Sequence, residues 1–413
     1  MDLANVKYWK HPSETNCVFV EESDSPLISI DFWCKAGIAF EEKNKVGLAH
    51  FLEHMIFKGS KLLEPGEFDM RIEELGGISN ASTGYDDVHY YVDIPPSNCE
   101  EALSLLTNLV LFPKLDEKEF YLEKKVIIEE ILQNQDQKDE LIFNSFLKSV
   151  WLDHHYAKSI LGKEENINEI ELFDLYDFHK KQYISINSCI AVAGKLPKNY
   201  LEIFRNCELR ESRKDLINSK KIPIDAYSIR EGKEIAFFKD IEFSRIFMAW
   251  HITSSNFQEN ILGYEIISSI LTDGRNSVLY KSLKEDKQIV QSIYSGIQLG
   301  EFGSLFIIET SLNKENLIEV ENIINNLIHD LLINSNLNNK IQKAIRIVKS
   351  KYIFNLETSS QLSYFFGNHL LWGRINPQIE LTKNFKYWQN TENLKKLMEF
   401  LLRDKFTFIA INK

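Results

Sequence analysis

Two histidines and a glutamate lie close together near the start of this chain, at His50, Glu53 and His54. On an α-helix, which turns by about 100° per residue, the three side chains share one narrow face. Two neutral imidazoles one turn apart can hold Zn²⁺, and a carboxylate beside them can take a proton from bound water. The pattern therefore predicts half of a zinc-peptidase site on a helix over residues 46–57. The alternative is accident, which would produce such a pattern in roughly two chains per hundred of this length.

A catalytic zinc site needs a third protein ligand and one open position. The predicted helix over residues 116–135 offers Glu123, Glu129 and Glu130. On that helix Glu130 falls inside the apolar stripe, Glu123 lies about 20° away, and Glu129 is about 100° off. A carboxylate in an apolar stripe is costly unless a positive group meets it. Glu130 is therefore the predicted third ligand, with Glu123 bonding a ligand or water beside it. The alternative is a helix whose glutamates pair with Lys124, Lys125 or another basic group.

The elements that position these residues repeat along the chain. Alternating runs predict strands, and apolar residues at three- and four-residue spacing predict helices. The first half contains predicted strands at 17–20, 27–36, 78–83, 88–95 and 189–194, and helices at 46–57, 66–75, 98–110 and 116–135. The second half contains predicted strands at 234–238, 244–252, 291–298, 304–312 and 406–411, and helices at 259–272, 276–285, 314–332 and 338–354. Matching elements are offset by about 216 residues, which indicates a long-period internal repeat.

This repeat predicts an α+β fold of two homologous domains, each a largely antiparallel sheet packed with several helices, which together make one half of a clamshell. We expect a zinc-bearing peptidase domain over residues 1–210, a linker rich in charged residues over 211–232, and a second domain over 233–413. Shifting the zinc motif by about 216 residues lands near Ile266, Ser269 and Ile270, which cannot bind metal. The second domain is therefore predicted to be inactive, and to serve as support, substrate surface or interface.

Composition limits the compartment and the partners. The 44% hydrophobic content is normal for a globular protein, and no run approaches the roughly 18 apolar residues of a membrane span. Five scattered cysteines and the lack of a signal-like apolar run in residues 1–11 favour a reducing compartment. We expect the cytoplasm, or an organelle matrix or stroma if a transit peptide has been removed. The net charge of −12 argues against nucleic acid and favours basic or neutral polypeptide partners.

Three segments together resemble one protein family. They are residues 47–59 (GLAHFLEHMIFKG), residues 76–83 (GGISNAST) and the helix that carries Glu123 and Glu130. These segments resemble the pitrilysin and mitochondrial-processing-peptidase family of zinc metallopeptidases, whose His-x-x-Glu-His motif inverts the familiar His-Glu-x-x-His order. In the second half, residues 273–280 (DGRNSVLY) resemble the family's Gly-rich helix start. The resemblance covers nearly the whole chain and accounts for its duplicated plan.

The resemblance implies a role for each residue of the predicted site. His50, His54 and Glu130 would be the zinc ligands, and Glu53 would be the general base that takes a proton from water. Glu123 matches a second acidic position of the family and would orient the site. The implied cofactor is Zn²⁺, and the implied substrates are peptides or unfolded polypeptide segments.

The resemblance also implies substrate-binding residues. Asn80 and Ala81 match an edge strand that pairs with extended substrate, whereas the plainer alternative is a hairpin strand after the Gly76-Gly77 turn. Many family members hold the substrate backbone with an arginine and a tyrosine in the second half. Here Lys284 and Gln291 occupy those positions. Zinc-bearing subunits of heterodimeric relatives show a similar loss, so we expect a dimer and favour a zinc-free sister chain. Lys284 could instead serve in a homodimer.

Two classes of function follow. The first is a zinc endopeptidase, the catalytic subunit of a dimeric processing or peptide-degrading protease. The second is a non-catalytic zinc-binding structural subunit of a larger complex. Such subunits typically lose one or more zinc residues, whereas this chain keeps all four positions of the motif and third ligand.

Overall fold

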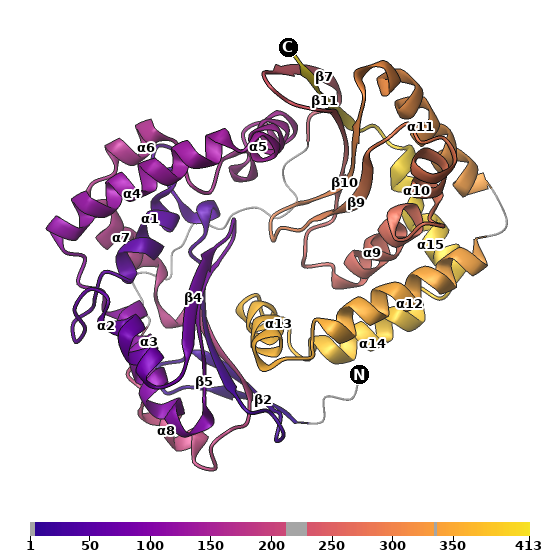
Figure 1. Ribbon diagram of the computed structural model, residues 1–413. Helices are drawn as coiled ribbons and strands as arrows, with labels where there is room; N and C mark the ends of the chain where they lie inside the picture. The colour runs from indigo at the N-terminus through magenta and orange to yellow at the C-terminus, as the bar shows by residue number, and fades with distance from the viewer. Residues whose placement is uncertain (1–4, 212–228, 334–336) are drawn as a thin grey trace. The chain divides into compact units, whose positions relative to one another are not determined.

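The computed structural model describes residues 5–211, 229–333 and 337–413 (Figure 1). Contacts between residues divide the chain into two compact units. The first holds the described residues within Met1–Asn134, Lys158–Lys221 and Phe354–Pro377, and the second holds those within Gln135–Ala157, Ile222–Ile353 and Gln378–Lys413. Each unit therefore takes a segment from the opposite half of the sequence.

The first unit is built on a six-stranded sheet with the strand order β1-β2-β6-β3-β5-β4. Its strands are β1 (Val6–Lys10), β2 (Asn16–Glu21), β3 (Ile28–Cys34), β4 (Ile78–Thr83), β5 (Val88–Ile94) and β6 (Ser188–Gly194). Neighbouring strands are antiparallel except for the parallel pair β2 and β6. Strands β3 and β6 are buried along their whole length because both faces of the sheet are covered, whereas the edge strand β4 is largely exposed.

Most helices of the first unit cover one face of this sheet. They are α1 (Leu48–Ile56), α2 (Glu67–Glu74), α3 (Cys99–Leu111), α4 (Glu117–Asp136), α6 (Glu164–Glu169), α7 (Leu172–Gln182) and α8 (Tyr200–Asn206), with short 3₁₀ turns at Ile38–Phe40, Pro96–Asn98 and Ser185–Asn187. Their apolar residues share one core with alternate strand residues such as Ile30, Phe32 and Tyr90. The two-residue period of the strands sends the intervening side chains to the opposite face.

The opposite face is covered by α13 (Ser359–Leu371), which comes from the second half of the chain. Leu362 and Phe366 pack against the strand residues Trp33 and Ala191. Small residues allow the helix to approach closely: Ser363 hydrogen-bonds Ser29 at 2.8 Å between the two Oγ atoms, and a Cβ at Gly367 would overlap the Trp33 ring. The helix is therefore an integral layer of the first unit.

The second unit contains a five-stranded sheet with the order β7-β11-β8-β10-β9. Its strands are β7 (Gly232–Phe238), β8 (Ser244–Ile252), β9 (Ser292–Gln298), β10 (Ser304–Leu312) and β11 (Phe406–Asn412). Its helices are α5 (Lys138–Trp151), α9 (Gln258–Thr272), α10 (Val278–Tyr280), α11 (Leu317–Ile333), α12 (Asn338–Phe354), α14 (Pro377–Tyr387) and α15 (Thr391–Met398), with a π-helix at Lys281–Asp286 and 3₁₀ turns at His155–Ala157, Lys314–Asn316 and Glu399–Leu402. Only β7 and β11 are parallel among these strands. Helix α5 joins this unit by stacking Phe146 on Phe247 at 4.8 Å between ring centroids.

The predicted α+β class with largely antiparallel sheets is confirmed. The two compact units differ from the predicted ranges 1–210 and 233–413 by exchanging α5 and α13, and the homology of the two halves stays a prediction. Most of the predicted linker 211–232 lies outside the described residues. The predicted helix 276–285 consists of the short α10 followed by the π-helix. In the described part of the chain, no helix has the length and apolar character needed to span a bilayer.

Candidate metal centre

Helix α1 carries three of the predicted site residues. It forms because apolar side chains recur at helical spacing and pack into the core; the buried ones are Leu48, Ala49, Phe51, Leu52, Met55 and Ile56. The remaining positions include His50, Glu53 and His54, whose rings and carboxylate line one side of the helix. The helix begins after Gly47, which has a left-handed backbone (φ 92°).

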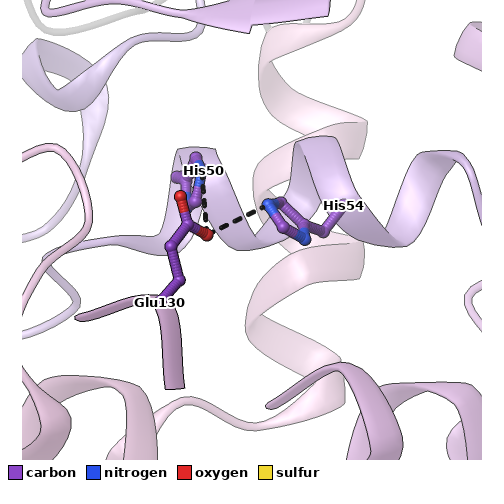
Figure 2. Close-up of side chains that lie close together, drawn as sticks. All are labelled: His50, His54 and Glu130. Carbon is purple, nitrogen blue, oxygen red and sulfur yellow. Dashed lines mark ion pairs between the residues drawn. The ribbon is translucent and has the colours of Figure 1, made fainter. Parts of the chain in front are cut away.

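The two histidines meet the carboxylate of Glu130, which comes from α4 (Figure 2). Oε2 of Glu130 lies 3.9 Å from Nε2 of His50 and 3.6 Å from Nε2 of His54. One ligand atom from each residue lies within 4.8 Å of the others. In a tetrahedral zinc site with bonds of about 2.0–2.2 Å, ligand atoms are roughly 3.4 Å apart. Small side-chain adjustments would therefore place all three atoms around one zinc ion, so the donor set fits the metal.

The protonation state of the site also suits a metal. Burial, and secondarily the neighbouring His54 ring, lowers the pKa of His50 to about 4. His50 is therefore neutral at physiological pH, which is the form in which imidazole binds zinc. The two rings lie 4.6 Å apart between centroids, in an edge-on arrangement.

A second carboxylate on α4 fixes the orientation of His54. Nδ1 of His54 donates to Oε1 of Glu123 at 2.8 Å, which leaves Nε2 free to bind a metal. Oε2 of Glu123 pairs with Nζ of Lys58 at 2.7 Å. Burial alone would raise the pKa of Glu123, but the hydrogen bonds from His54 and Lys58 hold it below its usual value. Glu123 is therefore an anion that supports the ligand.

Glu53 is held by a residue of the edge strand. The hydroxyl of Thr83, at the end of β4, donates to Oε2 of Glu53. Burial raises the pKa of Glu53, and the bond from Thr83 and the nearby His54 partly offset that rise. A carboxylate with a raised pKa is better matched to proton transfer near neutral pH.

Asn80 and Ala81 lie on β4, at the end of the sheet order. The backbone N–H of Ala81 donates to Oδ1 of Asn80 at 2.8 Å, so it is not engaged with β5. Since backbone groups alternate in direction along an antiparallel strand, this N–H belongs to the open edge. The Ala81 N–H on this edge is thus bonded to a short polar side chain of its own strand.

Lys284 belongs to the second unit, on the π-helix Lys281–Asp286. Its Nζ donates to the carbonyl oxygen of Gln291, the residue just before β9. Lys284 and Gln291 are therefore joined to each other.

Sequence reasoning missed two contributors to the site, Lys58 and Thr83. Lys58 lies in the turn just after α1, beyond its last helical residue Ile56, so helical spacing does not place it beside Glu123. Thr83 belongs to residues 76–83, which carry part of the family resemblance. Its contact with Glu53 depends on how β4 lies against α1, and sequence spacing does not specify that placement. Glu129, which the helical angles placed off the site face, is exposed.

Comparison with family models gives two adjacent matches. Residues 17–164 match the model described as insulinase (peptidase family M16), and residues 169–346 match the one described as peptidase M16 inactive domain. The first match contains the three candidate metal ligands.

Individual relatives agree with the family models. An uncharacterized zinc protease of Rickettsia bellii is 28% identical over 65% of this chain, which spans 64% of that relative's length. Zinc protease PqqE of Helicobacter pylori is 26% identical over 88% of this chain and 83% of its own length. The probable mitochondrial-processing peptidase subunit beta of Arabidopsis thaliana is 32% identical, over 40% of this chain and 31% of its own length.

Solved structures share the fold along the whole chain. A protease from Helicobacter pylori has a TM-score of 0.86 at 22% identity, covering 98% of this chain and 99% of that one. A structure from Pseudomonas fluorescens, titled peptidase M16 inactive domain, has a TM-score of 0.86 at 18% identity, covering 99% and 98%. Because two models of one family together match residues 17–346 almost without a gap, and relatives named as zinc proteases align with both halves, the chain belongs to peptidase family M16, the insulinase family.

Proposed function

We propose that this chain is a zinc metalloendopeptidase that hydrolyses peptides or unfolded polypeptide segments. The observation that carries the proposal is the joint presence of three ligands and a separate base: Glu130 meets the Nε2 atoms of His50 and His54, while Glu53 stands beside them, bonded to Thr83. Three protein ligands leave one position of a zinc ion open for water, and a free carboxylate beside them can take a proton from that water.

In this proposal each residue has a separate task. Zinc held by His50, His54 and Glu130 would lower the pKa of water and polarise the scissile carbonyl. Glu53 takes the proton from the attacking water and returns it to the leaving amine, and the Thr83 hydroxyl keeps its carboxylate aimed. Glu123 holds His54 in the tautomer that leaves Nε2 without a proton.

The open edge of β4 would bind the substrate backbone. An extended peptide that adds to this edge replaces Oδ1 of Asn80 as the acceptor for the Ala81 N–H, and the Asn80 amide is then released to bond the peptide. Backbone bonds of this kind tolerate many sequences. They suit a peptidase that degrades unfolded segments rather than one fixed site.

We further propose that the working enzyme is a dimer, with a related zinc-free chain as the favoured partner. The support is the second unit, where Lys284 donates to Gln291 in its own segment. A sister chain with an arginine and a tyrosine at these positions would supply the missing hold on the substrate. Adding such a chain to the purified protein should raise peptide hydrolysis, and an unchanged rate would contradict the heterodimer.

The decisive test changes one carboxylate at a time. Glu53→Gln should lower the hydrolysis of a quenched fluorogenic peptide by about 10³-fold or more while zinc content stays the same, because the base is lost and the ligands remain. Glu129→Gln, on the exposed side of α4, is the matched control and should retain activity. Unchanged hydrolysis by Glu53→Gln would refute the proposed mechanism.

The second candidate is a zinc-binding structural subunit. It is favoured by the likeness to a chain of Complex III2 from Candida albicans, with a TM-score of 0.81 at 14% identity, covering 98% of this chain and 96% of that one. A preparation with one zinc per chain, no hydrolysis alone or with a sister chain, and a stable place in a larger complex would support it over the peptidase.

A further inference from the structure

The helix that carries the zinc motif lacks a cap of its own. Helix α1 has only nine residues, and its first N–H groups have no partner within the helix. Its N-cap residue is Gly47, which has no side chain to offer. A larger residue is excluded there, because a Cβ would lie 2.7 Å from the carbonyl oxygen of Leu161 and 2.8 Å from Cδ1 of Ile167. The cap must therefore come from elsewhere in the chain.

Glu41 supplies that cap from six residues upstream. Its Oε2 accepts from the N–H of Gly47 at 3.1 Å, and its Oε1 accepts from the N–H of Ala49 at 2.8 Å. The glutamate is itself fixed, because its N–H donates to the carbonyl oxygen of Ile38 at 3.0 Å at the end of a 3₁₀ turn. The partial positive charge at this end of a helix also stabilises a carboxylate.

The two hydrogen bonds to Glu41 affect the position of His50 more than that of His54. Ala49 immediately precedes His50, so Glu41 holds the turn that carries the first ligand. His54 lies a full turn later and is separately fixed by Glu123. If the first turn frayed, His50 would lose its position while Glu53 and His54 kept theirs. Nδ1 of His50 has no hydrogen-bond partner among the described residues, so the backbone and packing of this turn determine where the ring lies.

We propose that Glu41 is a positioning residue of the metal centre, whose carboxylate holds the first turn of α1 and, through it, His50 in the metal-binding geometry. The inference rests on the proposed zinc site but does not require that the chain cleave peptides. It assigns to a residue outside the motif a share of the metal affinity.

The test compares zinc affinity in Glu41→Ala, Glu41→Gln and the native chain by competition with a chromophoric chelator. Glu42→Gln, at the exposed neighbouring position, is the matched control. Because burial raises the pKa of Glu41 to about 8, the comparison is made at about pH 8.5, where the carboxylate form prevails. We expect zinc affinity to fall about 10–100-fold in Glu41→Ala. The zinc affinity of Glu41→Gln should fall less, because its amide oxygen keeps one hydrogen bond. The zinc affinity of Glu42→Gln should equal that of the native chain.

Two further readouts separate positioning from general stability. The visible absorption of the Co²⁺-loaded protein should change in Glu41→Ala, since the ligand geometry changes, and His50→Ala combined with Glu41→Ala should lose little more affinity than His50→Ala alone. Equal zinc affinity in the native, Glu41→Gln and Glu41→Ala chains would overturn the inference and leave the proposed peptidase intact. The expected loss of zinc affinity in Glu41→Ala, together with no peptide hydrolysis by the native chain alone or with a sister chain, would reject the peptidase and leave the inference standing.

Discussion

His54 is the residue on which the polar contacts of the metal centre converge. Its Nε2 faces Glu130, and its Nδ1 is bonded to Glu123, which in turn pairs with Lys58. A series of polar contacts thus runs from the candidate ligand through Glu123 to Lys58. Each member fixes the proton position of the next, so the ligand's basicity depends on groups that never touch the metal.

Removing the charge of Glu123 tests whether these contacts support metal binding. Glu123→Gln can still accept from His54, but Lys58 loses its partner and the imidazole loses an anion that raises its basicity. We expect zinc affinity to fall about 10–100-fold, with a parallel loss of hydrolysis at limiting zinc. Chelator competition measures the first effect. Recovery of full activity in excess zinc would show that Glu123 acts by helping to retain the metal. An unchanged zinc affinity in Glu123→Gln would show that its contacts do not contribute to metal binding.

In the proposed peptidase, the edge strand β4 is the element that would link the motif to a substrate. It delivers Thr83 to Glu53 on one side and presents the Ala81 N–H on the other. One strand would therefore serve both the proposed base and the proposed peptide, and a change in its register would disturb both.

Proline substitutions distinguish the two edges of β4. Ala81→Pro removes an N–H that bonds only Asn80, so folding and zinc binding should survive while kcat/KM falls roughly threefold to tenfold through one lost substrate bond. Ser82→Pro removes the next N–H, which alternation points toward β5, and should lower the melting temperature as well. Calorimetry and peptide kinetics on both variants give the comparison. Normal kinetics in Ala81→Pro would argue against backbone addition at this edge.

Two helices of the second unit hold a partly buried acid between them. Burial raises the pKa of Glu265 on α9 to about 7, although the hydroxyl of Tyr352 on α12 donates to it. In the unfolded chain this carboxyl ionises near 4.5. The unfolded state therefore releases its proton first, and the stability of the second unit falls as pH rises from about 4.5 to about 7 and is level above that.

Glu265→Gln should remove this loss. At about pH 8 the variant should be more stable than the native chain by on the order of 2 kcal/mol, and at about pH 4.5 the difference should vanish. Urea denaturation at the two pH values measures it, with the exposed Glu259→Gln as control. A difference that did not change with pH would mean that Glu265 titrates normally.

Sequence patterns located elements better than they assigned them to layers. The strand over residues 78–83 and the helix over 338–354 have the predicted bounds, because alternation and helical spacing are local properties. No helix is predicted over residues 359–371, where α13 lies, and a local pattern does not state which sheet such a helix would cover; α13 lies on the first unit's sheet. In the same way, helical angles placed Glu130 and Glu123 on one face, whereas the Thr83–Glu53 contact required the sheet's tertiary placement.

At the scale of the whole molecule, the first unit is discontinuous in sequence. A fragment of residues 1–210 would contain every candidate zinc ligand but would expose the face formed by Val18, Trp33 and Ala191. Such a fragment should aggregate or unfold. Fusing residues 354–377 to it through a flexible linker should restore a soluble, zinc-binding protein.

The matched control is the same fusion with Phe366→Asp, which places a charge against that face and should stay insoluble. Soluble expression and zinc content are the measurements. A well-folded, zinc-binding 1–210 fragment would show that α13 is dispensable for the first unit.

The order of synthesis gives the placement of α13 a further consequence. The last strand of the first sheet ends at Gly194, whereas the helix that covers its second face ends at Leu371. At about 5–20 residues per second, a ribosome needs roughly 10–35 s to pass from one to the other. Throughout that interval the nascent chain carries all six strands of the sheet with one apolar face bare, and a chaperone that shields such surfaces has that time in which to act.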